Sequence, residues 1–133
     1  MKIVHVSGKR KRAIARATLK QGKGNIKINN QLIESFEPKF VRMKIMEPLI
    51  LAGDLAKKIN INVNVNGGGI ISQAEASRLA IARALIEYSK SKTIKEDFLK
   101  YDRHLLVADT RRKEASKPNR HGQARAKRQK SYR

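Results

Sequence analysis

The sequence predicts an α+β protein with a mostly antiparallel sheet, helices on one face of the sheet and an extended basic C-terminal tail. Residues 59–66 alternate strictly between Ile or Val and Asn, which is typical of a half-buried strand. Residues 72–89 carry apolar side chains at helical spacing. After residue 109 no Val, Ile, Leu, Phe or Met occurs. We therefore expect a folded domain over 1–109 and a tail over 110–133.

The first third of the chain is predicted to form short strands joined by tight turns. Residues 3–6 are mostly β-branched, residues 12–19 alternate loosely, and residues 25–28 alternate again. The asparagines that follow favour a turn at residues 29–31, because Asn tolerates left-handed backbone. This pattern predicts three antiparallel strands.

A first helix is expected between Pro38 and Gly53. Pro38 suits a first helical position, and the helix is expected to stop at Gly53. Pro48 lacks an amide hydrogen, so we expect a break near residue 47.

The second half of the chain is expected to add two helices and a strand. Ser72 and Glu75 have the spacing of a capping box, which would start the helix that runs to about residue 89. Residues 93–102 predict a short helix, and residues 104–109 a last edge strand.

Positive charge is concentrated at the two ends of the 133-residue chain. The formal net charge is +20, from 31 basic and 11 acidic residues. Residues 1–23 hold eight basic residues and no acid, and residues 110–133 hold ten basic residues and one acid. Such ends need a counter-charge, which nucleic acids or anionic membranes supply. The basic segments are not amphipathic with large apolar residues, which argues against a membrane-surface helix.

Several function classes fit the sequence poorly. The absence of Cys excludes disulfides, thiolate catalysis and Cys-based zinc sites. The three His show no HExxH spacing, so we expect no metal, no cofactor and no enzymatic activity. No apolar run approaches the roughly 20 residues of a membrane helix, and the N-terminus lacks the pattern of a signal peptide. We expect a cytoplasmic protein without a small-molecule substrate.

The three consecutive glycines Gly67, Gly68 and Gly69 invite comparison with phosphate-binding loops. The Walker pattern needs a Lys where Ile70 stands, and the dinucleotide pattern needs a Gly where Ser72 stands. Two interpretations remain open. The glycines form a flexible turn between a strand and a helix, or they let an RNA backbone approach free amides at the helix N-terminus.

Two basic segments are the strongest candidates for phosphate binding. The first lies at a turn between strands with no acid nearby, and the second is the tail, which is too poor in apolar residues to fold alone. A solvated loop and a tail without function are the alternatives. The rRNA-binding candidates in these segments are Lys9, Arg10, Lys11, Arg12, Arg16, Arg111, Arg112, Lys113, Arg120, Arg125, Lys127 and Arg128.

The residues around the glycines resemble the signature of the small-subunit ribosomal protein S nine family. The glycines are followed at the family's spacing by Ser72, Gln73, Ala76, Ala80, Ala82, Arg83, Ala84 and Leu85. The opening SGKRKRAIARATLKQGKGNIKIN and the basic tail resemble the family as well, so the similarity spans the chain. The ending QKSYR resembles the archaeal and eukaryotic branch, and the chain length favours an archaeal member.

This resemblance implies the fold of the ribosomal protein S five second domain, with a left-handed crossover. It implies a structural protein in the head of the small subunit that binds rRNA, with Gly67, Gly68, Gly69 and Gln73 among the contacts, beside other head proteins. It also implies that the tail is disordered off the ribosome and that its end contacts the anticodon stem-loop of P-site tRNA through Lys130, Ser131, Tyr132 and Arg133. Two alternatives stay open: an RNA-processing subunit of similar fold, such as a ribonuclease P protein, and a nonspecific nucleic-acid-compacting protein.

Overall fold

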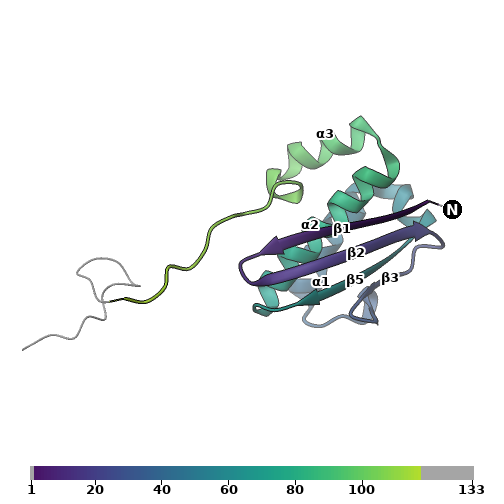
Figure 1. The fold of residues 1–133 in the computed structure, drawn as a ribbon. Coiled ribbons are helices and arrows are strands. Elements are labelled where there is room, and N and C mark those ends of the chain that lie inside the picture. Colours follow the sequence, from purple (N-terminus) through teal and green to yellow (C-terminus); the bar gives the residue numbers. More distant parts are fainter. Residues whose placement is uncertain (1, 118–133) are drawn as a thin grey trace, which may run out of the picture.

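A five-stranded sheet lies in front of two long helices in the computed structural model, which describes residues 2–117 (Figure 1). The expected α+β class, with helices on one face of the sheet, is confirmed. The strands are β1 (Ile3–Arg10), β2 (Ala13–Gln21), β3 (Ile26–Ile28), β4 (Gln31–Leu32) and β5 (Ile59–Asn66). The helices are α1 (Lys39–Ala52), α2 (Ile70–Ser89) and α3 (Lys92–Tyr101), with 3₁₀-helices at Ile33–Ser35, Gly53–Lys58 and Arg103–Leu105.

The order of the strands is β1-β2-β5-β3-β4, so β5 lies between the second and third strands. The pairs β1–β2 and β2–β5 are antiparallel, but β3 runs parallel to β5. The expected run of three adjacent antiparallel strands is therefore wrong at the third strand. The loop before β3 crosses the start of β5, where the amide of Gly24 donates to the carbonyl of Ile59 at 2.9 Å. Helix α1 then provides the long crossover that two parallel strands require.

The core lies between the sheet and α1 and α2. Buried and exposed side chains alternate along β2 and β5, so one face of each strand is buried, as the sequence predicts. Fully burying a side chain such as Ile61 stabilises the fold by about 1.5–3 kcal/mol. The alanines of β2 and α2 let strand and helix approach closely. At Gly8, a Cβ atom would lie 2.6 Å from the carbonyl oxygen of Ala76, so even Ala is too large there.

Helix α1 ends at Gly53, as expected, and Gly53 has a φ of 61°. The start of the helix and its course through Pro48 differ from the prediction. Pro38 precedes the first helical residue instead of occupying it, and the helix continues through Pro48 without the predicted break. The buried face of α1, which includes Val41 and Ile45 besides Pro48 itself, packs mainly against α2. This packing holds the helix together where one backbone hydrogen bond is missing.

Two expectations for the second half of the chain are also wrong. Helix α2 begins at Ile70, so Ser72 lies inside it, and the N-cap residue Gly69 has no side chain that could cap it. Glu75 is bound by cations from other elements instead. Residues 104–109 form no strand. The carboxylate of Asp102 accepts a hydrogen bond from the amide of His104 at 2.9 Å and starts a 3₁₀ turn instead. The short helix expected over 93–102 is confirmed as α3.

Candidate nucleic-acid interface

Three segments that the sequence singles out lie at one end of the sheet. They are the β1–β2 turn (residues 9–12), the glycine triplet (residues 67–69) and the root of the tail (residues 109–111). Figure 1 shows the hairpin turn, the end of β5 and the departing chain on the same side of the molecule. A Cβ atom on Gly67 would lie 2.6 Å from the carbonyl oxygen of Arg12, so the first two segments touch. We call these three segments together the basic end.

The β1–β2 turn places two exposed cations beyond the edge of the core. Arg10 pairs with Ala13, so only Lys11 and Arg12 form the turn. Lys11 has a φ of 52° at the first central position of the hairpin, where glycine is commonly favoured. A side chain in left-handed backbone costs about 1–2 kcal/mol. Lys11 is nevertheless exposed, so its charge faces solvent and not the core.

The glycine triplet divides into two glycines that the fold requires and one that it does not. Gly67 and Gly68 have φ of 79° and 65°, and a Cβ atom on Gly68 would lie 3.0 Å from the backbone nitrogen of Ala13. Gly69 has ordinary backbone, and a Cβ atom there would meet nothing within 4 Å. The side chain of Gln73 donates to the carbonyl of Gly67 at 3.0 Å and ties the triplet to α2.

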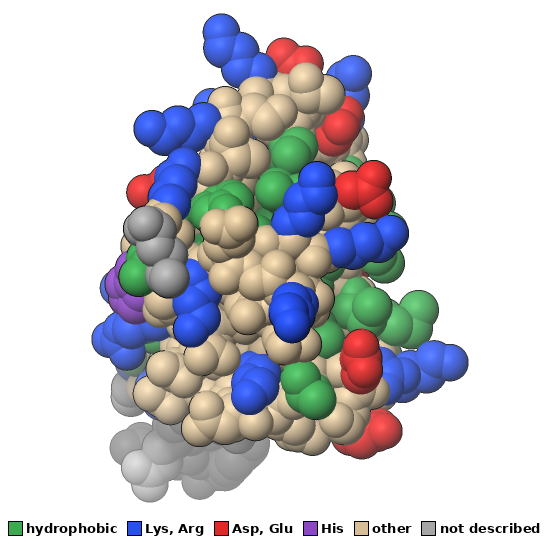
Figure 2. All heavy atoms as spheres, turned by 90° about the vertical axis from the view of Figure 1, so that its right-hand side faces the viewer, with side chains coloured by type: hydrophobic (Ala, Val, Ile, Leu, Met, Phe, Trp, Pro, Cys, Tyr) green, Lys and Arg blue, Asp and Glu red, His purple; other side chains and the backbone are tan. Residues whose placement is uncertain are grey.

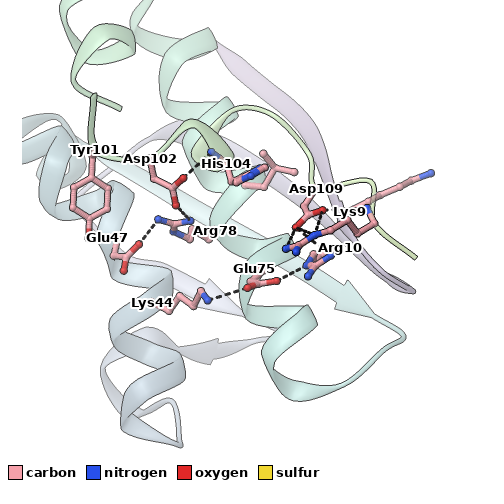
Figure 3. A pocket seen from close by; sticks show the side chains of 12 residues that line it. Lys9, Arg10, Lys44, Glu47, Glu75, Arg78, Tyr101, Asp102, His104 and Asp109 are labelled. Carbon is pink, nitrogen blue, oxygen red and sulfur yellow. Dashed lines mark hydrogen bonds and ion pairs between the residues drawn. The ribbon is translucent and has the colours of Figure 1, made fainter. Parts of the chain in front are cut away.

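The root of the tail is held by ion pairs around a cavity of about 400 Å³ between α1, α2 and the C-terminal segment (Figure 3). Glu75 accepts from Nε of Arg10 at 2.6 Å and from Nζ of Lys44 at 2.9 Å. Burial raises the pKa of Glu75, but these two hydrogen bonds and charges outweigh it, so its pKa lies below the ordinary value. Arg10 also lies 3.4 Å from Asp109.

Asp109 forms ion pairs with Arg111, two residues further along the chain, and with Arg10 of β1. The guanidinium of Arg111 donates to the Asp109 carboxylate through Nε at 3.0 Å and through Nη2 at 2.6 Å. The backbone amide of Arg111 donates to the same carboxylate at 3.1 Å. These hydrogen bonds from Arg111 and the nearby Arg10 hold the pKa of Asp109 far below its usual range. The carboxylate is therefore charged at neutral pH and neutralises cations of its own chain.

The same cavity contains a second ion-pair set around the buried Arg78. Its guanidinium lies 2.5 Å from Oε2 of Glu47 in α1 and 3.0 Å from Oδ2 of Asp102, which follows α3. Burial raises the pKa of Asp102, and the hydrogen bonds from the His104 amide and from Arg78 more than reverse this effect. Removing one partner of such a pair leaves a buried charge uncompensated, so this set holds three elements together.

Comparison with known proteins identifies the family. The family model described as Ribosomal protein S9/S16 matches residues 8–133. The small ribosomal subunit protein uS9 of Methanococcus maripaludis (strain C7) is 52% identical over 134 residues, which cover all of both chains. That of Methanococcus vannielii has the same identity and coverage. The chain belongs to the S9 family of ribosomal proteins.

Membership of the S9 family confirms several expectations. The family consists of structural proteins of the small ribosomal subunit, not of enzymes, and its members function in the cytoplasm as parts of the ribosome. The resemblance seen in the sequence is thereby confirmed, and the relatives are archaeal, as the C-terminal ending suggests.

Within residues 2–117 no helix has the length and hydropathy to cross a membrane, and no cluster of His, Asp or Glu could hold a metal ion.

The structure separates the predicted rRNA-binding residues into distinct groups. In the described part of the chain Lys9, Lys11, Arg12, Arg16, Arg112 and Lys113 are exposed and take part in no ion pair. Arg10 is bound internally, and Arg111 is exposed but paired with Asp109. The remaining tail candidates, Arg120, Arg125, Lys127, Arg128, Lys130, Ser131, Tyr132 and Arg133, lie outside the described residues.

Sequence reasoning missed the internal ion pairs. Arg78, Glu75 and Asp102 look like ordinary helix and loop residues in the sequence, and their partners lie on other elements. No spacing rule connects residues so far apart. The one available signal is that Arg78 stands among apolar residues of α2, where a solvent-facing position is not expected.

Proposed function

We propose that this ribosomal protein of the small subunit binds rRNA through the basic end and the tail, and that the end of the tail contacts P-site tRNA. One observation supports the rRNA site most strongly. Asp109, which belongs to the basic end, and Glu75, which binds Arg10 of the same end, are already bound by internal cations. Lys11 and Arg12 therefore stand exposed without an acidic partner in the described part of the chain, at the point where the tail leaves the domain.

Recognition through these residues is mainly of RNA phosphate and shape. Lys and Arg at a turn contact phosphates, which position a protein on RNA without reading its sequence. If six tail cations neutralise phosphates, the logarithm of the affinity falls with the logarithm of the salt concentration with a slope of about −4. A nonspecific compacting protein would show a similar salt dependence. The salt series must therefore be repeated with DNA as a competitor, which separates the two.

The tail extends this binding beyond the reach of the folded domain. With ten cations and one acid over residues 110–133, it repels itself until a polyanion neutralises it. Extended, 24 residues span at most roughly 80 Å. We infer that rRNA orders the tail and that residues 130–133 at its tip reach the anticodon stem-loop of P-site tRNA. Family membership and the concentration of charge support this inference.

Ultraviolet crosslinking in native cell extract, followed by sequencing of the attached RNA, tests the proposal. We expect crosslinks confined to the head of small-subunit rRNA, and tRNA anticodon stems joined to peptides from residues 130–133. Crosslinks to precursor tRNA would favour an RNA-processing subunit. Crosslinks spread over DNA and many RNAs would favour a compacting protein, and either result would overturn the proposed function.

A further inference from the structure

The face of the sheet opposite α1 and α2 is not covered by any element of residues 2–117. In Figure 1 this face lies in front of both helices. Its side chains come from alternate residues of β1, β2, β5 and β3, and the strand register places them in rows across the sheet. We call this surface the open face. Its central residues are Arg16, Thr18 and Lys20 of β2, Asn60, Asn62 and Asn64 of β5, and Lys27 of β3.

The open face carries positive charge without any acid. None of the five strands contains Asp or Glu, so every one of the eleven acids of the chain lies on helices, connections or the tail. Arg16, Lys20 and Lys27 are exposed and form no ion pair within residues 2–117. Figure 2 shows a different side of the molecule, where acidic side chains stand among the basic ones. The separation of charge is thus a property of the open face and not of the whole surface.

The asparagines of β5 are the second unusual feature of this surface. Asn is depleted in strands, where Thr or Val is more stable, yet here it stands at alternate positions. Asn60 has an internal role, because its side-chain oxygen accepts from the amides of Lys23 and Asn25 at 3.0 and 3.1 Å. Asn62 and Asn64 are exposed and form no side-chain hydrogen bond with the described residues. Their amides remain available as donors and acceptors.

The register brings these amides beside the cations. Arg16 pairs with Asn64, and Lys27 pairs with Asn62, so each basic side chain has an amide on the neighbouring strand. Paired residues on adjacent strands have Cβ atoms about 4.5–5.5 Å apart. A hollow of about 220 Å³ beside the second of these pairs is lined by Thr18, Lys20, Asn25, Lys27, Asn60 and Asn62.

We propose that the open face binds the sugar–phosphate backbone of an rRNA strand, as a second contact surface beside the basic end. Arg16, Lys20 and Lys27 bind phosphates, and Asn62 and Asn64 hydrogen-bond to phosphate oxygens and ribose hydroxyls. This inference rests on the proposed function. The five strands contain no Phe, Tyr or Trp, and the imidazole of His5, 2.9 Å from Oγ1 of Thr18, is the one aromatic ring on the open face, so contacts to the backbone outnumber any stacking contact.

Charge and composition favour RNA over a protein partner as the occupant. The core of a protein interface is depleted of charged residues and anchored by aromatic or large apolar side chains. The middle of the open face has none: its exposed apolar residues, Ile3 and Leu32, lie on the outer strands β1 and β4, and the half-buried Ile14 lies at the end of β2 next to the turn. Three unpaired cations and free amides suit a polyanion with ribose hydroxyls.

The test compares two full-length triple variants in binding to small-subunit rRNA transcribed in vitro, over a series of KCl concentrations. One variant carries Arg16→Gln, Lys20→Gln and Lys27→Gln. The control carries Lys39→Gln, Lys95→Gln and Lys100→Gln, which remove the same charge from exposed positions of α1 and α3. We expect the first variant to flatten the salt slope by about 2 and to weaken binding about 50-fold at 0.15 M KCl, and the control to change both much less. Equal losses in the two variants would overturn the proposal.

A variant that keeps the charge tests the asparagines. Asn62→Thr with Asn64→Thr suits a strand better, so the midpoint of thermal unfolding should not fall. We expect weaker rRNA binding with an unchanged salt slope, and unchanged affinity would refute the role of the amides.

Amine labelling of purified small subunits distinguishes an RNA occupant from a protein. Lys20 and Lys27 should be protected from labelling in the subunit and become reactive after ribonuclease treatment. Protection that survives the ribonuclease would show a protein on the open face and overturn the proposal. If the wild-type chain binds rRNA no better than DNA, the proposed function itself fails. If it binds rRNA specifically but the open-face variant behaves like its control, only the present inference fails.

Discussion

Nη1 of Arg10 lies 3.4 Å from Oδ2 of Asp109, so the last residue of β1 is paired with the residue from which the tail departs. Because Nε of Arg10 also binds Glu75 of α2, strand, helix and tail root share one guanidinium. Arg10 therefore acts within the fold, although it lies in the middle of the basic cluster. Its neighbours in the β1–β2 turn remain exposed.

Replacing Arg10 should affect stability more than RNA binding. Arg10→Gln removes a charge-assisted hydrogen bond to Glu75 and an ion pair with Asp109 from a side chain that is only 14% exposed, and should lower the free energy of unfolding by about 1–2 kcal/mol. Lys11→Gln, its matched control, should change that free energy by less than about 0.5 kcal/mol. Urea denaturation at pH 7 measures both variants. Equal stability of the two would show that the Arg10 ion pairs contribute nothing.

Lys11→Gly should weaken RNA binding without lowering stability, which is the reverse of the effect expected for Arg10→Gln. Glycine removes the strain of left-handed backbone at a φ of 52°, at the cost of more freedom in the unfolded chain. We expect a free energy of unfolding equal to that of the wild type or up to about 1 kcal/mol higher, and weaker rRNA binding with a salt slope reduced by about 1. Unchanged affinity in a filter-binding assay would mean that Lys11 does not contact phosphate.

The glycine triplet offers a pair of substitutions with opposite outcomes. Gly68→Val introduces a β-branched side chain at a φ of 65° and against Ala13, so it should destabilise the protein by about 2–4 kcal/mol. Gly69→Ala meets open space and ordinary backbone, so its stability should stay within about 0.5 kcal/mol of the wild type. Thermal unfolding checks both values. If Gly69→Ala nevertheless weakens rRNA binding, an RNA backbone approaches there. Unchanged affinity assigns the triplet to the fold alone.

Sequence patterns predicted those features that depend on neighbours along the chain. The alternation of β5 and the end of α1 at Gly53 follow from local periodicity and backbone preference. The capping box failed because α2 begins at Ile70, so Ser72 lies inside the helix, and Glu75 pairs with Arg10 of β1 and Lys44 of α1. The position of β5 between β2 and β3 also depends on contacts between segments that are far apart in the sequence. For the site, the pattern found the basic turn and the glycines but could not separate the internally bound Arg10 from the exposed Lys11.

Removing the tip of the tail should separate assembly from tRNA binding. Deletion of residues 131–133 leaves the basic end, the open face and most tail cations in place, so incorporation into small subunits should be nearly unchanged. The same subunits should release P-site tRNA faster, because three of the four proposed tRNA contacts are gone and only Lys130 remains. Sucrose-gradient sedimentation measures incorporation, and tRNA dissociation from purified ribosomes measures retention. A loss of assembly would show that the tip anchors the chain to rRNA.

The ion pairs around Glu75 and Asp102 should make the fold sensitive to acid. In the folded protein the pKa values of both carboxyl groups lie below their ordinary values, whereas in the unfolded chain they return to about 4. Their contribution to stability is complete above the unfolded pKa. It is lost as the pH falls through the folded pKa, because the unfolded chain binds protons first. The free energy of unfolding should therefore decrease steadily from about pH 5 downwards.

Glu75→Gln tests whether this network causes the acid sensitivity. The variant should lose about 1–2 kcal/mol at pH 7, a value reduced for the partial exposure of Glu75, and should depend less on pH between about 5 and 3. Glu96→Gln is the matched control, since it removes the same charge from an exposed position of α3 without an ion pair in the described residues. Urea denaturation across this pH range should separate the two variants. If both keep the wild-type dependence on pH, acid acts through the overall positive charge of the chain and not through the cations bound to Glu75.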